Sequence, residues 1–414
     1  TLTTSAVTNI TETSATLNGV ISIVSENCED PTNTEQGFVY ATTIQPTTNN
    51  TQVNVNGTNI TTTLENLEPN TTYYARTFLT NAFGEFYGNE VSFITSEEPV
   101  NCDVVYLAEN GITIKACDDA NIGDTGVVNG VTYTVVDEAM LREMAQNEED
   151  VTKVVTTKVT DMTGMFSNSD FNQQIGNWDV GNVTTMEYMF AFTSFNQPIG
   201  DWDVSNVTTM KYMFGNSSFN QPIGDWDVSS VTDMECMFCT TPFNQDISNW
   251  DVSSVTNMGN MFISADAFNQ PIGNWDVSNV TNMESMFYGN TAFNQPIGNW
   301  DVSNVTVMIS MFQNATSFNQ PIGNWDVSSL GTDEEYPIAA VLFMFQGATA
   351  FNQPIGDWDV SNVYNMSQMF QDATAFNQNL SSWSVDGVTY CGSFSQDATS
   401  WTLPQPNFTN CDPN

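Results

Sequence analysis

Residues 293–312 read FNQPIGNWDVSNVTVMISMF, and versions of this stretch recur along most of the chain. The tryptophan of each copy follows the previous one after 24 or 25 residues, except for a single interval of 33. A fixed period of this length predicts a stack of repeated structural units. We expect the array to extend over residues 151–394, with Val154 in place of tryptophan in a degenerate first repeat. The repeat tryptophans are Trp178, Trp202, Trp226, Trp250, Trp275, Trp300, Trp325, Trp358 and Trp383.

Each repeat divides into two predicted elements and a return loop. Trp300 and Val302 would point to the same side of a short strand, because strand side chains alternate. Residues 305–312 place valine, methionine and phenylalanine on one face of a short helix, with Ser303 or Asn304 as its N-cap. No unit could bury these side chains alone, so neighbours must stack. The pattern predicts an α/β solenoid of short parallel strands and short helices.

The repeat motif also shows a likeness to a known family. Nine Phe-Asn-Gln segments and eight Trp-Asp-Val segments occur in the chain. In these motifs the chain resembles the BspA-type leucine-rich-repeat bacterial surface proteins, also called mycoplasma lipoprotein-type repeats. The resemblance implies a leucine-rich-repeat-like solenoid on a bacterial cell surface or in a secreted protein. It further implies a role as an adhesin or interaction protein.

Residues 1–97 differ in kind from the repeats. Alternating apolar and polar residues, for example over residues 15–21, predict a small all-β domain. The stretch LEPNTTY at residues 67–73 resembles the tyrosine-corner region of fibronectin type III domains. That resemblance implies a β-sandwich in which Tyr73 forms a hydrogen bond to the preceding chain.

Residues 98–150 are expected to cap the N-terminal end of the repeats. Residues 104–107, 111–116 and 130–136 are predicted strands, and Asp137 would cap a short helix. A solenoid needs such caps because its end repeats would otherwise expose the core.

Residues 395–414 are expected to form the C-terminal cap. The chain has seven cysteines, and an oxidising compartment would turn some of them into disulfides. We predict a bridge between Cys391 and Cys411 within this cap. A second predicted bridge joins Cys102 and Cys117, although connectivity cannot be deduced from sequence.

The charge balance excludes several classes of partner. Six lysines and arginines face 48 aspartates and glutamates, which gives a net charge of −42. Such a chain repels nucleic-acid phosphates and anionic membrane surfaces. The negative charge favours the binding of cations or basic partners. Alternatively, it serves only to keep the protein soluble. The sequence contains no apolar run long enough to span a bilayer, and no signal-peptide pattern.

The sequence does not predict an enzyme. It contains no histidine, which removes histidine-based triads and metal sites. No phosphate-binding loop or dinucleotide fingerprint occurs. Cys236 and Cys239 have a redox-like spacing, but the βαβ context of a redox motif is missing. We expect them to be a structural bridge or two incidental thiols.

The aspartate after each repeat tryptophan is the sharpest candidate for a site. If the tryptophans face inward, these aspartates face outward in one row, at the spacing of neighbouring strands, about 4.7–4.9 Å. Carboxylates that close would repel one another unless something offsets the charge. Either each binds backbone N–H groups or a serine hydroxyl, or the row binds calcium or a basic ligand. The row comprises Asp179, Asp203, Asp227, Asp251, Asp276, Asp301, Asp326 and Asp359.

The asparagine of each Phe-Asn-Gln segment forms a second row. We expect these amides to be buried in turns and to bond neighbouring loops. The row comprises Asn172, Asn196, Asn220, Asn244, Asn269, Asn294, Asn319, Asn352 and Asn377.

An insertion at about residues 331–342 accounts for the one long tryptophan interval. Insertions in repeat proteins form loops on one face, which is often the binding face. The insertion is therefore either a partner-binding loop or a harmless decoration. Its candidate binding residues are Asp333, Glu334, Glu335 and Tyr336.

Together these features predict an extracellular bacterial surface adhesin or interaction solenoid. Its acidic strand face would meet a protein, a glycan or a cation. The alternative is a structural subunit of a fibre or surface layer, which binds further copies of itself and is stabilised by calcium. No other cofactor is expected.

Overall fold

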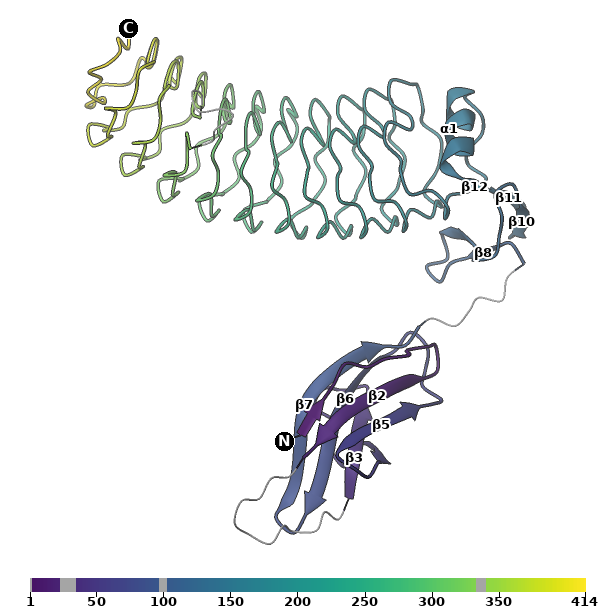
Figure 1. Ribbon diagram of the computed structural model, residues 1–414. Helices are drawn as coiled ribbons and strands as arrows, with labels where there is room; N and C mark the ends of the chain where they lie inside the picture. Colours follow the sequence, from purple (N-terminus) through teal and green to yellow (C-terminus); the bar gives the residue numbers. More distant parts are fainter. Residues whose placement is uncertain (1, 23–34, 97–102, 333–339) are drawn as a thin grey trace. The chain divides into compact units, whose positions relative to one another are not determined.

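The computed structural model describes residues 2–22, 35–96, 103–332 and 340–414. The chain divides into two compact units, residues 1–101 and residues 102–414 (Figure 1). Each unit has its own hydrophobic core. Within the described ranges, no helix has the length and apolar character needed to cross a membrane.

The first unit consists of antiparallel strands in two sheets, with strand orders β1-β2-β5 and β4-β3-β6-β7. Alternation along β2 buries Ala15 and Leu17 between the sheets, against Phe38 and Ala75. The strands are β1 (Leu2–Thr4), β2 (Ala15–Ile21), β3 (Glu35–Ala41), β4 (Thr51–Asn54), β5 (Asn59–Leu64), β6 (Thr72–Asn81) and β7 (Gly84–Ile94).

Tyr73, near the start of β6, bonds back to the preceding chain. Its hydroxyl oxygen accepts a hydrogen bond from the Glu68 backbone N–H at 2.9 Å. Its ring stacks on Phe93 of β7 with centroids 5.7 Å apart. This geometry agrees with a tyrosine corner, while the fibronectin type III resemblance itself stays a prediction.

The second unit opens with small sheets and one helix. Strands β8 (Val105–Leu107) and β9 (Ile114–Ala116) form a two-stranded sheet. Strands β10 (Thr125–Val128), β11 (Val131–Val135) and β12 (Val154–Val155) form a sheet in which β11 and β12 run parallel. Helix α1 (Glu138–Gln146) lies between β11 and β12 in the chain. The strands near residues 104, 111 and 130 and the helix after Asp137 therefore occur close to their predicted positions.

Helix α1 closes one end of the repeat core. The Asp137 carboxylate accepts a hydrogen bond from the Met140 backbone N–H at 2.8 Å, as an N-cap does. Leu141 is fully buried and joins the core of the repeats. Strand β9 attaches to the first repeats, because the Ile114 N–H donates to the Asn177 carbonyl at 2.9 Å. The N-terminal segment thus covers the first repeat and pairs with it.

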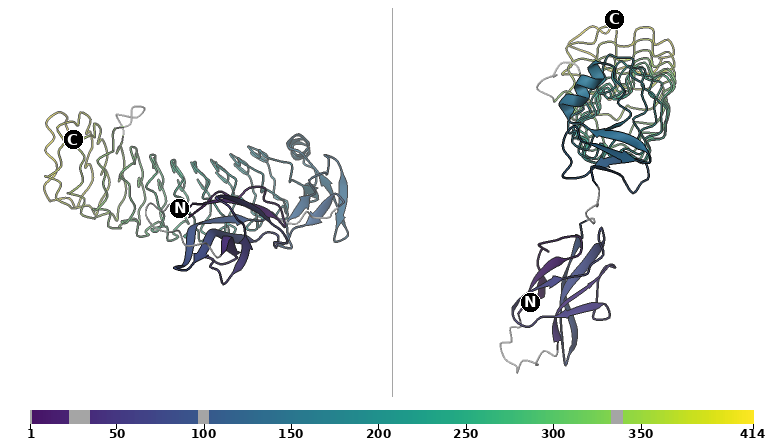
Figure 2. Two further views of the ribbon diagram at one scale, coloured as in Figure 1. Left: turned by 60° about the horizontal axis from the view of Figure 1, so that its bottom comes forward. Right: turned by 90° about the vertical axis from the view of Figure 1, so that its right-hand side faces the viewer.

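The repeats form successive coils of the chain around one core (Figure 1). The end-on view in Figure 2 shows the coils behind one another, with α1 at the near end. Backbone bonds tie each coil to the next. For example, Met210 N–H donates to the Asp233 carbonyl at 3.0 Å, and Tyr212 N–H donates to the Glu235 carbonyl at 2.8 Å. Isolated parallel bridges between neighbouring coils accompany these bonds.

The predicted α/β solenoid is wrong, because the described repeats contain no helices. Helix α1 is the one helix among the described residues, and it precedes the array. The segment expected to be helical instead makes two short turns, each containing a residue with left-handed backbone, such as Tyr212 (φ 55°) and Asn216 (φ 56°). These turns also space apolar residues three apart, so they mimic the helical pattern. Alternate N–H groups are thereby turned towards the next coil.

The Trp-Asp-Val segments are not regular strands either. They are held by the tryptophan side chain rather than by a continuous backbone ladder. The Trp250 indole N–H donates to the carbonyl of Ile223 in the preceding repeat at 3.1 Å. The same bond recurs from Trp202 to Ile175 and from Trp383 to Ile355, at 3.1 and 3.0 Å. Each buried indole donor is therefore satisfied, as burial requires.

The insertion leaves the stack continuous. The Met308 N–H donates to the Ala340 carbonyl at 2.8 Å, and Trp358 reaches the Ile322 carbonyl at 3.1 Å. The coils on either side of residues 333–339 are thus bonded as elsewhere in the stack.

The C-terminal segment covers the last coil. The Trp401 indole donates to the Gln378 carbonyl at 2.9 Å. Phe394 donates its N–H to the Pro413 carbonyl at 3.2 Å, and its ring packs edge-on against Phe408.

Candidate binding surfaces

Most aspartates of the predicted row bond to the serine two residues later. Oδ1 of Asp203 accepts hydrogen bonds from the Ser205 N–H at 3.2 Å and from its hydroxyl at 2.6 Å. The backbone bond recurs at Asp276 and Asp359. Both bonds recur at Asp227, Asp251, Asp301 and Asp326.

These bonds favour the charged form of the aspartates. Hydrogen bonds from Ser253, Ser303 and Ser361 lower the pKa of Asp251, Asp301 and Asp359, respectively. Each carboxylate therefore stabilises its own turn while the other side remains in water.

Asp179 departs from this pattern and joins the cap to the repeats. It is buried, with 5% of its surface exposed. Its carboxylate accepts a hydrogen bond from the Thr157 hydroxyl at 2.6 Å and lies 3.9 Å from the Lys115 ammonium.

The aspartate row does not gather into a ready-made metal centre. Among the residues that the structure describes, no three histidine, cysteine, aspartate or glutamate side chains lie close enough together to hold a metal ion. The calcium hypothesis for the row stays a prediction.

The asparagine row links successive loops. Oδ1 of Asn196 accepts hydrogen bonds from the Asn220 N–H at 2.9 Å and from Gln221 Nε2 at 3.0 Å. The same pair of bonds continues from Asn220 to the next repeat. The row is not buried as predicted: Asn172 and Asn294, for example, are exposed. Amides in this row can bond without burial because they lie between two coils.

The remaining predicted sites give a mixed result. Asp333, Glu334, Glu335 and Tyr336 lie outside the described residues, as does Cys102. The structure contains the Cys391–Cys411 disulfide, and a second disulfide joins Cys236 to Cys239.

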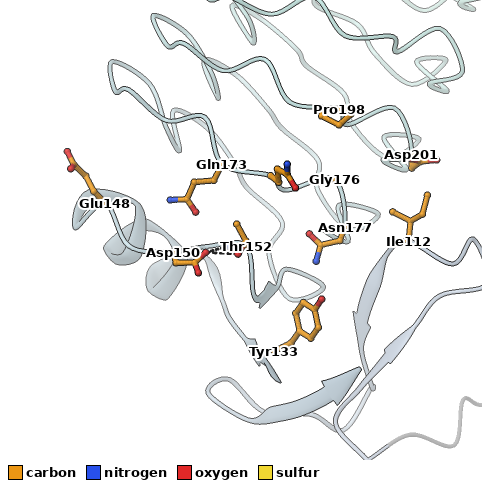
Figure 3. A pocket seen from close by; sticks show the side chains of 11 residues that line it. Ile112, Tyr133, Glu148, Asp150, Thr152, Gln173, Gly176, Asn177, Pro198 and Asp201 are labelled. Carbon is orange, nitrogen blue, oxygen red and sulfur yellow. Dashed lines mark hydrogen bonds between the residues drawn. The ribbon is translucent and has the colours of Figure 1, made fainter. Parts of the chain in front are cut away.

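Sequence reasoning missed a cleft between the N-terminal cap and the first repeats. It has a volume of about 880 Å³, and Figure 3 shows the side chains around it. Ile112 and Tyr133 come from the cap, whereas Asn177 and Asp201 come from the first repeats. These residues are far apart in sequence, so no local motif signals the cleft.

Some polar groups of the cleft are already engaged. Gln173 accepts a hydrogen bond from the Val151 N–H and donates one to the Glu149 carbonyl, at 2.9 and 2.8 Å. Oδ1 of Asp150 accepts from the Thr152 N–H and hydroxyl at 3.0 and 2.6 Å, and these bonds lower the pKa of the Asp150 carboxyl.

Other polar groups of the cleft have no hydrogen-bond partner among the described residues. They are the Tyr133 hydroxyl, the side-chain amides of Gln174 and Asn177, and the carboxylates of Glu148 and Asp201. Figure 3 shows Tyr133 below Asn177, with Ile112 beside them. The cleft thus combines free amides, a hydroxyl and carboxylates with apolar surface.

A further surface follows from comparing the repeats with one another. Most repeats contain two methionines three residues apart. The residue after the first of them varies widely: it is Glu187, Lys211, Glu235, Gly259 and Glu284 in successive repeats. The next position also varies and carries glycine, tyrosine, cysteine, asparagine, serine, phenylalanine or glutamine. An alignment of the repeats that looked for variable positions, rather than for the repeating ones, would have identified these two positions.

A model of one protein family, described as "Mycoplasma protein of unknown function, DUF285", matches the chain at residues 137–246, 236–339 and 336–411. The three matches span well over half of the chain and include the repeats. No curated protein matches the chain, and no solved structure does. The resemblance to mycoplasma-type repeats is thereby confirmed at the level of the family, without support for the leucine-rich-repeat class.

Proposed function

The chain belongs to this DUF285 family of unknown function, and on that premise we propose that it is an extracellular binding protein of a bacterial surface. The disulfides Cys236–Cys239 and Cys391–Cys411 support this location, because such bonds persist in oxidising compartments.

The cleft between the cap and the first repeats carries the proposal. Its volume of about 880 Å³ lies in the range of small-ligand sites, about 300–1,000 Å³. Strand β9 is bonded to Asn177, so the two walls belong to one packed structure. Such a site is formed before the ligand arrives, which lowers the cost of binding.

The ligand that best fits this lining is a glycan. Sugar hydroxyls both donate and accept hydrogen bonds, as the free amides of Gln174 and Asn177 require. The carboxylates of Glu148 and Asp201 can accept from further hydroxyls. The Tyr133 ring and Ile112 offer apolar surface for the carbon face of a sugar ring.

We further propose that the cleft binds a glycan without hydrolysing it. A glycosidase needs one carboxyl with a raised pKa to act as general acid. The hydrogen bonds from Thr152 lower the pKa of Asp150 instead, so Asp150 does not meet this requirement. We therefore propose that the protein holds its ligand without converting it.

The test is a glycan array with the whole chain, followed by calorimetry on the oligosaccharides retained. Tyr133→Ala and Asn177→Ala should each weaken binding about tenfold, which corresponds to about 1.4 kcal/mol. Tyr364→Ala is the matched control, because Tyr364 is 48% exposed on a later repeat. Retention of no oligosaccharide, or equal losses in all three variants, would refute the glycan site.

The alternative role, a fibre subunit, is less consistent with the covered ends of the stack. Helix α1 covers the first coil, and the segment with Trp401 and Phe408 covers the last. Addition of another copy end to end would first have to displace these contacts. We expect light scattering to show no concentration-dependent filaments of the purified chain; filaments would favour the structural role.

A further inference from the structure

One row of the repeats carries aromatic side chains that its backbone does not require. Gly164, Tyr188, Tyr212 and Cys236 occupy the same place in successive coils, all with left-handed backbone at φ between 54° and 61°. Coil-to-coil bonds fix this register, since Gly164 N–H donates to the Glu187 carbonyl at 2.7 Å. We call this set the tyrosine row.

A tyrosine is energetically unfavourable in this backbone conformation. Left-handed backbone is a genuine outlier for a bulky side chain. Later members of the same row include Asn260, Ser285 and Ser310, alongside the larger Phe343 and Gln368. Smaller residues therefore satisfy the fold. Strained residues that the fold does not need point to a functional role.

The two tyrosines stack on each other and leave one outer face open. Their ring centroids are 4.8 Å apart with planes inclined by 12°. A Cβ placed on Gly164, the preceding member of the row, would meet no atom within 4 Å. The row therefore has a position beside Tyr188 that carries no side chain, and we call it the empty position.

The surroundings of the empty position are acidic. Asp161 and Glu138 both pair with Arg142, at 3.6 and 3.0 Å, and Glu187 adds a further carboxylate next to Tyr188. Glu138 and Asp161 thus share one guanidinium, which also donates to the Thr163 carbonyl at 2.7 Å. Lys211, on the other side, is paired with Glu235 at 2.7 Å, so it does not offset this charge.

We propose that the tyrosine row docks a basic protein segment, with an arginine side chain stacked on Tyr188 over Gly164. A guanidinium is planar, stacks on aromatic faces and pairs with carboxylates, whereas an ammonium cannot stack in this way. Phe192, four residues after Tyr188, is 50% exposed and offers apolar contact to the neighbouring residue of the segment. This surface is separate from the glycan cleft and does not depend on it.

The test uses a labelled peptide of alternating arginine and glycine, with a lysine–glycine peptide of equal length as the comparison. Both are titrated by fluorescence anisotropy against the full chain at physiological salt, which screens general attraction to an acidic protein. The arginine peptide should bind more tightly. Tyr188→Ser should reduce its affinity roughly two- to thirtyfold, from cation–π energies of about 0.5–2 kcal/mol.

Two further variants keep the outcome decisive. Gly164→Tyr fills the empty position with a residue that this backbone already accepts at Tyr188, and it should abolish the preference for arginine. Tyr364→Ser, outside the row, should change nothing. The proposal is overturned if Tyr188→Ser and Gly164→Tyr, both shown to melt as the parent does, bind the arginine peptide normally. It is also overturned if Tyr364→Ser weakens binding equally. Tyr133→Ala should leave peptide binding intact, so failure of the glycan site would be recognised separately.

Discussion

Two kinds of row run along the same stack of coils. The tryptophan, aspartate and asparagine rows repeat with little change, and their polar groups bond within the protein, as Trp250 and Asn220 do. The tyrosine row changes from coil to coil, and Tyr188 and Tyr212 have no hydroxyl partner among the described residues. Regular rows therefore serve the fold, while variable rows are available for recognition.

The comparison also changes the meaning of the aspartate row. Its regularity first suggested a binding face, because eight outward carboxylates are conspicuous in the sequence. In the structure the same regularity reflects a turn that is built again in each coil. A side chain that every coil needs for its own turn cannot be varied to suit a partner.

The largest effect is expected in the tryptophan row. Trp250→Ala removes a side chain that is 4% exposed, together with its bond to Ile223. The loss should be about 3–5 kcal/mol, measured by chemical denaturation. Tyr212→Ser should lower the free energy of unfolding far less, because serine occupies this position in other coils. Similar losses for the two variants would break the distinction between constant and variable rows.

The asparagine row should show an intermediate effect. Asn220→Ala leaves the Asn244 N–H and the Gln245 amide without their acceptor. The expected loss in the free energy of unfolding is about 0.5–1.5 kcal/mol, because these groups are only partly buried. It would be seen as a lower denaturation midpoint. Asn299 is exposed and has no hydrogen-bond partner among the described residues, so Asn299→Ala is the control. A neutral Asn220→Ala would show that the row is dispensable.

A smaller effect, dependent on pH, is expected in the aspartate row. Serine hydrogen bonds lower the pKa of Asp251 and Asp301 in the folded state. Their contribution is therefore complete above the unfolded pKa of about 4 and is lost as pH falls through the folded value. Replacing Ser253 and Ser303 by alanine should lower the melting temperature at pH 7 but not near pH 2. A difference that persists in acid would assign the effect to packing instead.

The smallest effect is expected from calcium. If the aspartates act within their own turns, millimolar calcium or a chelator should leave the melting temperature unchanged. Calcium prefers six to eight oxygen ligands, which a single row does not gather. A clear rise with calcium, but not with magnesium, would restore the metal hypothesis for the row.

Part of the fold could be predicted from the sequence on physical grounds. The period of 24 or 25 residues predicted the stack, because a unit rich in tryptophan, phenylalanine and methionine cannot bury them alone. Asp137 identified the start of α1. The helix expected in each repeat was wrong, since residues three apart also face one way in successive turns with left-handed residues such as Ser310.

The candidate sites likewise include features that the sequence predicts and features that it does not. An outward aspartate row follows from alternation alone, but its bonding to serine depends on a turn that only the backbone geometry reveals. The cleft could not be predicted, because Ile112, Tyr133 and Asp201 meet only when the cap packs on the repeats.

The sequence by itself determined that the chain repeats, which residues enter the core and that the surface is acidic. These properties depend on composition and period, which are local. Only the tertiary structure decided how the coils bond, where the ends are covered and which polar groups remain free. Those properties depend on which N–H groups turn towards the next coil, and Tyr188 becomes a candidate for recognition only because Gly164 leaves the neighbouring place empty.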